Sequence, residues 1–155
     1  MAEAFTDTGI IDGYHAHLYY APETRPIAAR LRAAIGEGFP QARIGNWHDE
    51  PVGPHPAAMY QVAFAVEDFP RLVPWLMLNR DGLDVLVHPL TDDSVADHTR
   101  FALWLGAPLP LRVEVLRKGP GPCDPPEPRS RGPYIRPKAS RTITMISNKP
   151  SPLLG

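Results

Sequence analysis

Hydrophobic and polar positions alternate along several stretches of the chain in the way that is typical of β-strands. The clearest stretch, at residues 14–20 of a strand predicted over about 9–20, reads Tyr-His-Ala-His-Leu-Tyr-Tyr. Because side chains i and i+2 share a face of a strand, His15, His17 and Tyr19 should project to one side and Leu18 to the other. One face therefore carries reactive side chains and the other is suited to packing. Four further strands are predicted at 43–48, 59–66, 84–88 and 111–116.

Apolar residues at helical spacing predict three helices between these strands. The first should begin after Thr24, a capping residue, and end at Gly36 or Gly38. The second should begin after Asp68 and end before Gly82. The third should begin after Asp93 or Ser94 and continue to about residue 105.

The order strand, helix, strand, strand, helix, strand predicts an α+β ferredoxin-like sandwich, with an antiparallel sheet, helices on one face, and the third helix and an edge strand added. The first strand would then be central, between the third and fourth. His15 and His17 should consequently share an open sheet face with Gln61 and His88. A proline-rich loop at 49–56 should hold His48 and His55 near the sheet edge, stiffened by its three prolines.

Charge divides the chain in two. Residues 1–118 carry a net charge of −5, whereas residues 119–155 carry +4 and nine of the 20 prolines. We expect a folded domain at 1–118 and a basic, extended or disordered tail at 119–155, in which 142–146 alone has a strand-like pattern. The overall charge of −1, the single Cys123, and the lack of a signal-like or membrane-spanning run favour a cytoplasmic protein that binds neither nucleic acid nor membrane.

All six histidines lie within residues 15–98, inside the predicted domain. Several neutral imidazoles on one rigid face suit Fe(II), Cu(II) or Zn(II). Metalloprotease, structural zinc, phosphate-loop and hydrolase-elbow motifs are absent from the sequence. The pattern leaves three interpretations open: a metal-dependent enzyme, a non-catalytic binding module, and a sheet face used for dimerisation. His15 and His17 could also be paired surface residues, and His98 a hydrogen-bonded core residue.

Four separated motifs resemble the DOPA 4,5-dioxygenase family over roughly residues 10–116: the histidine-rich stretch at 14–20, Pro-Val-Gly-Pro-His-Pro at 51–56, Val-His-Pro-Leu-Thr at 87–91, and Asp-His at 97–98 with Trp-Leu-Gly at 104–106. The resemblance implies a ferredoxin-like fold, a non-haem metal centre, usually iron, and extradiol cleavage of a catechol. The sequence departs from the family at Asp92, where a His-Pro-x-Thr-Gly turn would have glycine.

These observations give a specific hypothesis for the site. We expect His17, His55 and His88 to bind the metal, Fe(II) first and Zn or Cu as substitutes, with His15 as a fourth ligand or as the acid/base. Catalytic roles in proton transfer or on the substrate are expected for His15, His48 and His98. Substrate contacts are expected from Tyr19, Arg43 and Gln61.

The partners expected from this hypothesis are a catechol such as DOPA, O2, and a second copy of the chain, which would form a homodimer through the open sheet face or the sheet edge. The alternative is a non-catalytic metal- or aromatic-binding module with the same fold.

Overall fold

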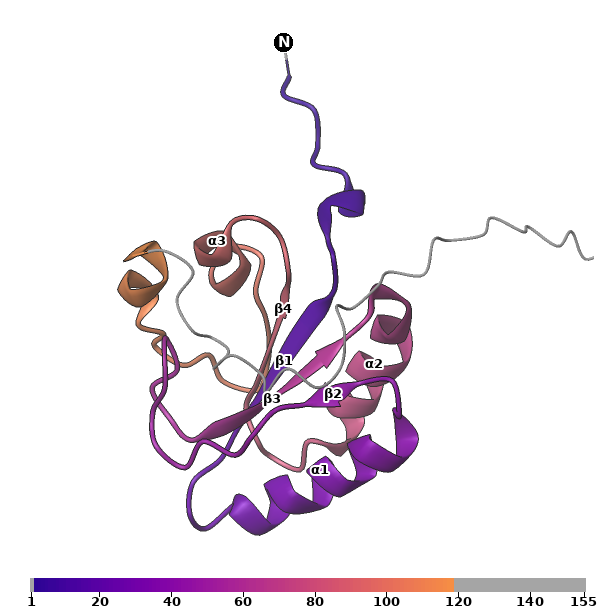
Figure 1. Cartoon of the computed structure of the whole chain (residues 1–155), viewed down its shortest axis with the longest axis vertical. Coiled ribbons are helices and arrows are strands. Elements are labelled where there is room, and N and C mark those ends of the chain that lie inside the picture. Colours follow the sequence, from indigo (N-terminus) through magenta and orange to yellow (C-terminus); the bar gives the residue numbers. More distant parts are fainter. Residues whose placement is uncertain (1, 119–155) are drawn as a thin grey trace, which may run out of the picture. The chain divides into compact units, whose positions relative to one another are not determined.

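The computed structural model describes residues 2–118 and contains one antiparallel sheet with helices on both sides (Figure 1). The strands are β1 (Tyr14–Tyr19), β2 (Arg43–Ile44), β3 (Met59–Phe64), β4 (Val85–Pro89) and β5 (Leu103–Leu105), in the spatial order β2-β3-β1-β4-β5. The helices are α1 (Arg25–Gly38), α2 (Phe69–Asn79) and α3 (Ser94–His98), with short 3₁₀ turns η1 (Thr8–Ile10), η2 (Val66–Asp68) and η3 (Val113–Lys118). The predicted tail and its strand at 142–146 lie outside the described residues.

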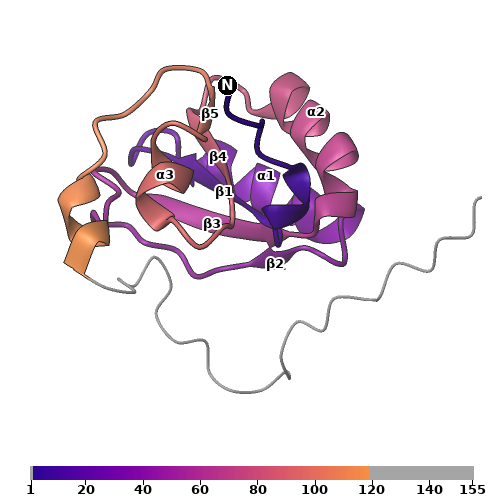
Figure 2. The same ribbon diagram turned by 90° about the horizontal axis from the view of Figure 1, so that it is seen from above.

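Helices α1 and α2 cover one face of the sheet, as the ferredoxin-like prediction requires (Figures 1 and 2). Leu18 of the central strand is fully buried there, together with Leu31 of α1 and Leu72 of α2. Burying a leucine side chain stabilises a fold by roughly 1.5–3 kcal/mol. The alternation in β1 therefore fixes which of its faces meets the helices. The predicted fold class and the central position of the first strand are confirmed.

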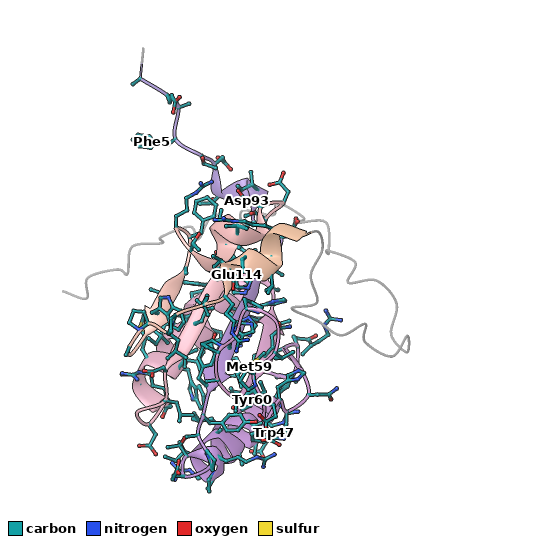
Figure 3. The ribbon with its side chains drawn as sticks, turned by 90° about the vertical axis from the view of Figure 1, so that its left-hand side faces the viewer. Phe5, Trp47, Met59, Tyr60, Asp93 and Glu114 are labelled. Atoms are coloured by element: carbon teal, nitrogen blue, oxygen red, sulfur yellow. The ribbon has the colours of Figure 1, made fainter. Side chains whose placement is uncertain are left out.

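The other face of the sheet is covered by the chain itself, so the expectation of an open face was wrong. Helix α3 packs against β4 and η3 on this side, as Figures 1 and 2 show. The Arg112 amide donates a 2.8 Å hydrogen bond to the Pro54 carbonyl and joins two covering segments. Beneath them, Tyr19, Met59 and Leu86 form a small apolar cluster. Figure 3 views the molecule from this side, with Met59 labelled on β3 and Glu114 on η3.

Two predicted elements differ from the structure near the end of the domain. The helix predicted to reach residue 105 ends at His98, and Leu103–Leu105 instead form the edge strand β5 against β4. Asp93 caps this short helix by accepting a 2.9 Å hydrogen bond from the Ala96 amide. Pairing with β5 satisfies backbone groups of β4 that would otherwise lack partners, which outweighs the helical pattern. The strand predicted at 111–116 is replaced by η3.

Smaller differences concern the caps and the second strand. Thr24 and Asp68 precede their helices but make no capping side-chain bond, and each helix has a proline in its first turn. Only Arg43–Ile44 of the predicted strand 43–48 pair continuously, and His48 forms an isolated bridge with Met59. None of the helices within residues 2–118 is long and apolar enough to cross a membrane.

Candidate metal centre

Strand pairing brings three histidines together on the face of the sheet that lies opposite α1 and α2. In the antiparallel pair of β1 and β4, His15 lies directly across from His88, and His17 follows two residues later on the same face. All three side chains are buried, with exposed fractions of 7% for His15, 0% for His17 and 1% for His88. The first strand therefore presents its two imidazoles inward, which excludes the interpretation as paired surface histidines.

Two more histidines reach this group from outside the sheet. His55 lies in a tight turn in which its amide donates a 2.9 Å hydrogen bond to the Val52 carbonyl, and His98 is the last residue of α3. The rings of His17 and His55 have centroids 4.1 Å apart, and those of His88 and His98 are 4.0 Å apart. These five buried residues, called the histidine cluster below, are His15, His17, His55, His88 and His98.

Hydrogen bonds at Nδ1 orient three members of the histidine cluster. Nδ1 of His88 donates to the Pro89 carbonyl and Nδ1 of His98 donates to the Ser94 carbonyl, each at 2.8 Å. A carbonyl can only accept, so these Nδ1 atoms carry the proton and Nε2 carries the lone pair. Nδ1 of His55 lies 2.7 Å from the Tyr19 hydroxyl. Metal-binding histidines are held by bonds of this kind.

The distances within the histidine cluster fit a metal ion. Nε2 of His17 and Nε2 of His88 are 3.1 Å apart. Two imidazole nitrogens that share a metal at about 2.0–2.1 Å would be separated by about 2.9–3.4 Å in octahedral or tetrahedral geometry. Within the described residues, buried Nε2 of His55 has no hydrogen-bond partner. Unpaired buried nitrogens of this kind are costly unless a ligand satisfies them.

Two groups of three histidines have candidate ligand atoms within 4.8 Å of one another. One consists of His15, His17 and His88, and the other of His17, His55 and His98. His17 belongs to both groups. A metal centre built from either group would therefore include His17.

Burial keeps the imidazoles in the neutral form that binds metal. Desolvation is the largest cause in each case, and it is reinforced by neighbouring imidazoles for His17, His55 and His88. The pKa values of His17 and His88 fall well below the usual value, and the pKa of His55 falls to about 3. Desolvation also lowers the pKa of His98, against an opposing effect from the Ser94 carbonyl and Asp97. Near neutral pH these four rings offer lone pairs to a metal.

Asp97 is the only buried acidic residue within the part of the chain that the structure describes. Its carboxylate accepts hydrogen bonds from the Thr91 amide at 2.9 Å and the Thr91 hydroxyl at 2.6 Å. These bonds tie α3, which carries His98, to the segment that follows His88. Asp92 in this turn needs no glycine-like backbone, because Asp81 is the only non-glycine residue of the described chain with positive φ.

The other predicted site residues lie around the histidine cluster. His48 is half-buried outside it, and Arg43 is exposed on the edge strand β2. The Gln61 amide nitrogen lies 3.5 Å from Nε2 of His15. Trp104, whose ring stacks on Tyr19 with centroids 6.0 Å apart, is not among the predicted site residues, although it lies in the Trp-Leu-Gly motif at 104–106. The short alternation at 103–105 is the sequence signal that indicates its strand.

The fold and the histidine cluster together define an α+β protein with a buried, carboxylate-poor site suited to a transition metal. The chain belongs to the Dopa 4,5-dioxygenase family, whose model matches residues 14–115.

Among known proteins, this chain is 37% identical over 130 residues to an uncharacterised 21.2 kDa protein of Botryotinia fuckeliana. The match covers 75% of this chain and 71% of that protein. It is 31% identical over 116 residues to the DOPA 4,5-dioxygenase of Amanita muscaria, covering 68% of this chain. The match spans about half, 50%, of the Amanita protein's length. A solved structure of a candidate dioxygenase from Nostoc punctiforme is 53% identical, with a TM-score of 0.72, covering 73% of this chain and 97% of that one.

Proposed function

We propose that this protein is an extradiol dioxygenase that cleaves the ring of a catechol such as DOPA at a non-haem Fe(II) centre. Family membership supports a dioxygenase. The observation that carries the proposal of a metal-dependent reaction is the histidine cluster, with its neutral imidazoles and the unpaired Nε2 of His55. O2 is the oxidant and supplies both inserted oxygen atoms, so the reaction needs no further reductant.

The charge of the site favours a catechol as the substrate. The histidine cluster supplies only neutral ligands, and the carboxylate of Asp97 is engaged by Thr91. A bound divalent cation would therefore keep its full positive charge in a buried environment, which is unfavourable without a counter-charge. A doubly deprotonated catechol carries two negative charges on adjacent oxygens and would supply that counter-charge.

When bound, Fe(II) with open positions would allow the two catechol oxygens and O2 to bind side by side and electron density to pass from the ring to oxygen. The chain's own residues would hold the ring nitrogens in place, and the covering segments would exclude water. His15 lies two residues from His17 on the same strand face and within 3.5 Å of the Gln61 amide. In this proposal, the neutral His15 ring takes up the catechol proton at the nitrogen that carries its lone pair, becomes an imidazolium, and returns the proton later in the reaction.

The test is oxygen consumption. Purified protein is loaded with Fe(II) without air and then given L-DOPA and oxygen, and we expect one O2 to be consumed per catechol as a yellow semialdehyde forms. The matched control is His17→Ala, treated in the same way. If neither colour nor oxygen uptake appears with several catechols while the wild type binds metal, the protein is instead the non-catalytic binding module.

The remaining proposals concern the protein's location, oligomeric state and partners. We propose a cytoplasmic homodimer that binds neither nucleic acid nor membrane. The overall charge of −1 supports the absence of nucleic acid, because it provides no electrostatic attraction to phosphates. Because the sheet face is covered by the chain itself, a sheet edge is the better candidate for the contact. Sedimentation of the purified full chain tests the dimer, and a purely monomeric species would contradict it.

A further inference from the structure

Tyr19 and His55 are joined by a short, fully enclosed hydrogen bond. The Tyr19 hydroxyl lies 2.7 Å from Nδ1 of His55, and the exposed fractions of the two residues are 4% and 0%. The two residues are 36 positions apart in the chain. Tyr19 belongs to the central strand β1, whereas His55 lies in the loop before β3. The bond therefore connects a rigid strand to the loop that delivers one member of the histidine cluster.

The proton balance of His55 fixes the direction of this bond when a metal is present. Nε2 of His55 is buried and has no hydrogen-bond partner within the described residues. A neutral imidazole carries one proton, and a nitrogen that binds a metal must present its lone pair. If Nε2 binds the metal, the proton must be on Nδ1. His55 then donates to the Tyr19 oxygen, which accepts.

Packing and strand pairing hold the Tyr19 side chain in one position. Its ring stacks on Trp104 of β5 at an interplanar angle of 19° and packs with Met59 and Leu86. Neighbouring strands pair with β1 on both sides. A hydroxyl held in this way can impose an orientation on a loop residue, because a ring in a packed strand has few alternative rotamers.

We infer that Tyr19 is a positioning residue that fixes the tautomer and orientation of His55 for metal binding through Nε2. This inference rests on the proposed metal centre, and it gives Tyr19 a role other than the substrate contact predicted from the sequence. Residues that orient metal-binding histidines typically change metal affinity by 10–100-fold when they are removed. Tyr19 should act on the metal before any substrate is present.

The experiment compares Tyr19→Phe with Tyr20→Phe in the full chain, with Zn(II) affinity measured by competition with a chromophoric chelator. Tyr20 is a matched control because its hydroxyl donates a 2.7 Å bond to Asp49, in the same loop, but contacts no histidine through that bond. We expect Tyr19→Phe to weaken Zn(II) binding by about 10–100-fold. Tyr20→Phe should change it by less than about twofold. Unchanged affinity in Tyr19→Phe, or equal losses in both variants, would overturn the inference.

A second measurement does not depend on the variant folding. In nitrogen-15 spectra of the Zn(II)-loaded wild type, we expect His55 to show a protonated Nδ1 and a metal-bound Nε2. An unprotonated or metal-bound Nδ1 would overturn the inference.

His55→Ala separates this inference from the proposed function. If His55→Ala binds Zn(II) as tightly as the wild type, His55 is no ligand and the inference fails, while oxygen uptake by the wild type still decides the proposed reaction.

Discussion

Acid should unfold the metal-free protein at a pH at which most domains are still stable. The pKa values of His17, His55, His88 and His98 are all lowered in the folded state. Below a pH of about 6.5 the unfolded chain therefore binds more protons than the folded chain, and the free energy of unfolding decreases as the pH decreases. The stability that depends on these residues is fully present above about pH 6.5 and is lost progressively toward lower pH.

The size of the effect can be estimated for His55, which has an exposed fraction of 0% and a folded pKa of about 3. At a pH of about 4.5 this histidine is protonated in the unfolded chain but neutral in the folded one. Two pH units below a pKa of about 6.5 correspond to a loss of roughly 3 kcal/mol from this residue alone. His17 and His88 add to the loss in the same direction. Since domains are typically stable by about 5–15 kcal/mol, unfolding near pH 4–5 is expected.

Urea unfolding of chelator-treated protein, followed by tryptophan fluorescence at pH 8, 6 and 4.5, measures this dependence. The matched variant is His55→Gln, which keeps a polar side chain but cannot titrate. The difference in unfolding free energy between pH 8 and 4.5 should be smaller in the variant by roughly 3 kcal/mol. Equal unfolding midpoints at pH 8 and 4.5 in the wild type would refute the reasoning, and an unchanged difference in His55→Gln would refute the assignment to His55.

Three further predictions follow from the site and the core. His17→Ala should abolish stoichiometric metal binding, because His17 belongs to both candidate groups; elemental analysis checks this, and a fully loaded variant would contradict it. Leu18→Ala should lower the free energy of unfolding by about 2–5 kcal/mol through a cavity beside α1, and a loss below 1 kcal/mol in urea unfolding would show that this site is not tightly packed. Asp97→Asn should cost about 1–3 kcal/mol, because the amide cannot accept both bonds from Thr91, and should also weaken Zn(II) binding by displacing His98. Wild-type Zn(II) affinity in that variant would exclude the coupling.

The pattern along the first strand was sufficient to predict the centre of the sheet. Alternation is local, and a one-residue shift would move Leu18 to the face of the histidine cluster and bury the histidines against the helices, so the register follows from the sequence. Chain order then predicted that His88 shares a sheet face with His15 and His17, and the pairing of β1 and β4 places His88 directly across from His15. The family resemblance, based on separated histidine motifs, is confirmed as well.

Predictions from the local sequence pattern were wrong or incomplete where the structure depends on residues far away in the chain. Residues 103–105 have a pattern that fits either a helix or a short strand, and the unpaired edge of β4 decided between the two. The same holds for His98, which the sequence left open between a core residue and a catalytic one. Its position beside His88 depends on the cap made by Asp93 and on the bonds between Asp97 and Thr91.

The sequence by itself therefore determined the two faces of β1, the order of the elements and the presence of histidines on the face away from α1 and α2, because these features follow from periodicities of two and 3.6 residues. Only the tertiary structure decided that this face is closed and that His55 and His98 join the other three in one buried cluster. The reason is physical: a loop and a one-turn helix have no periodicity that fixes their direction. Their side chains are placed by contacts with residues far away in the chain, such as the hydrogen bond between His55 and Tyr19.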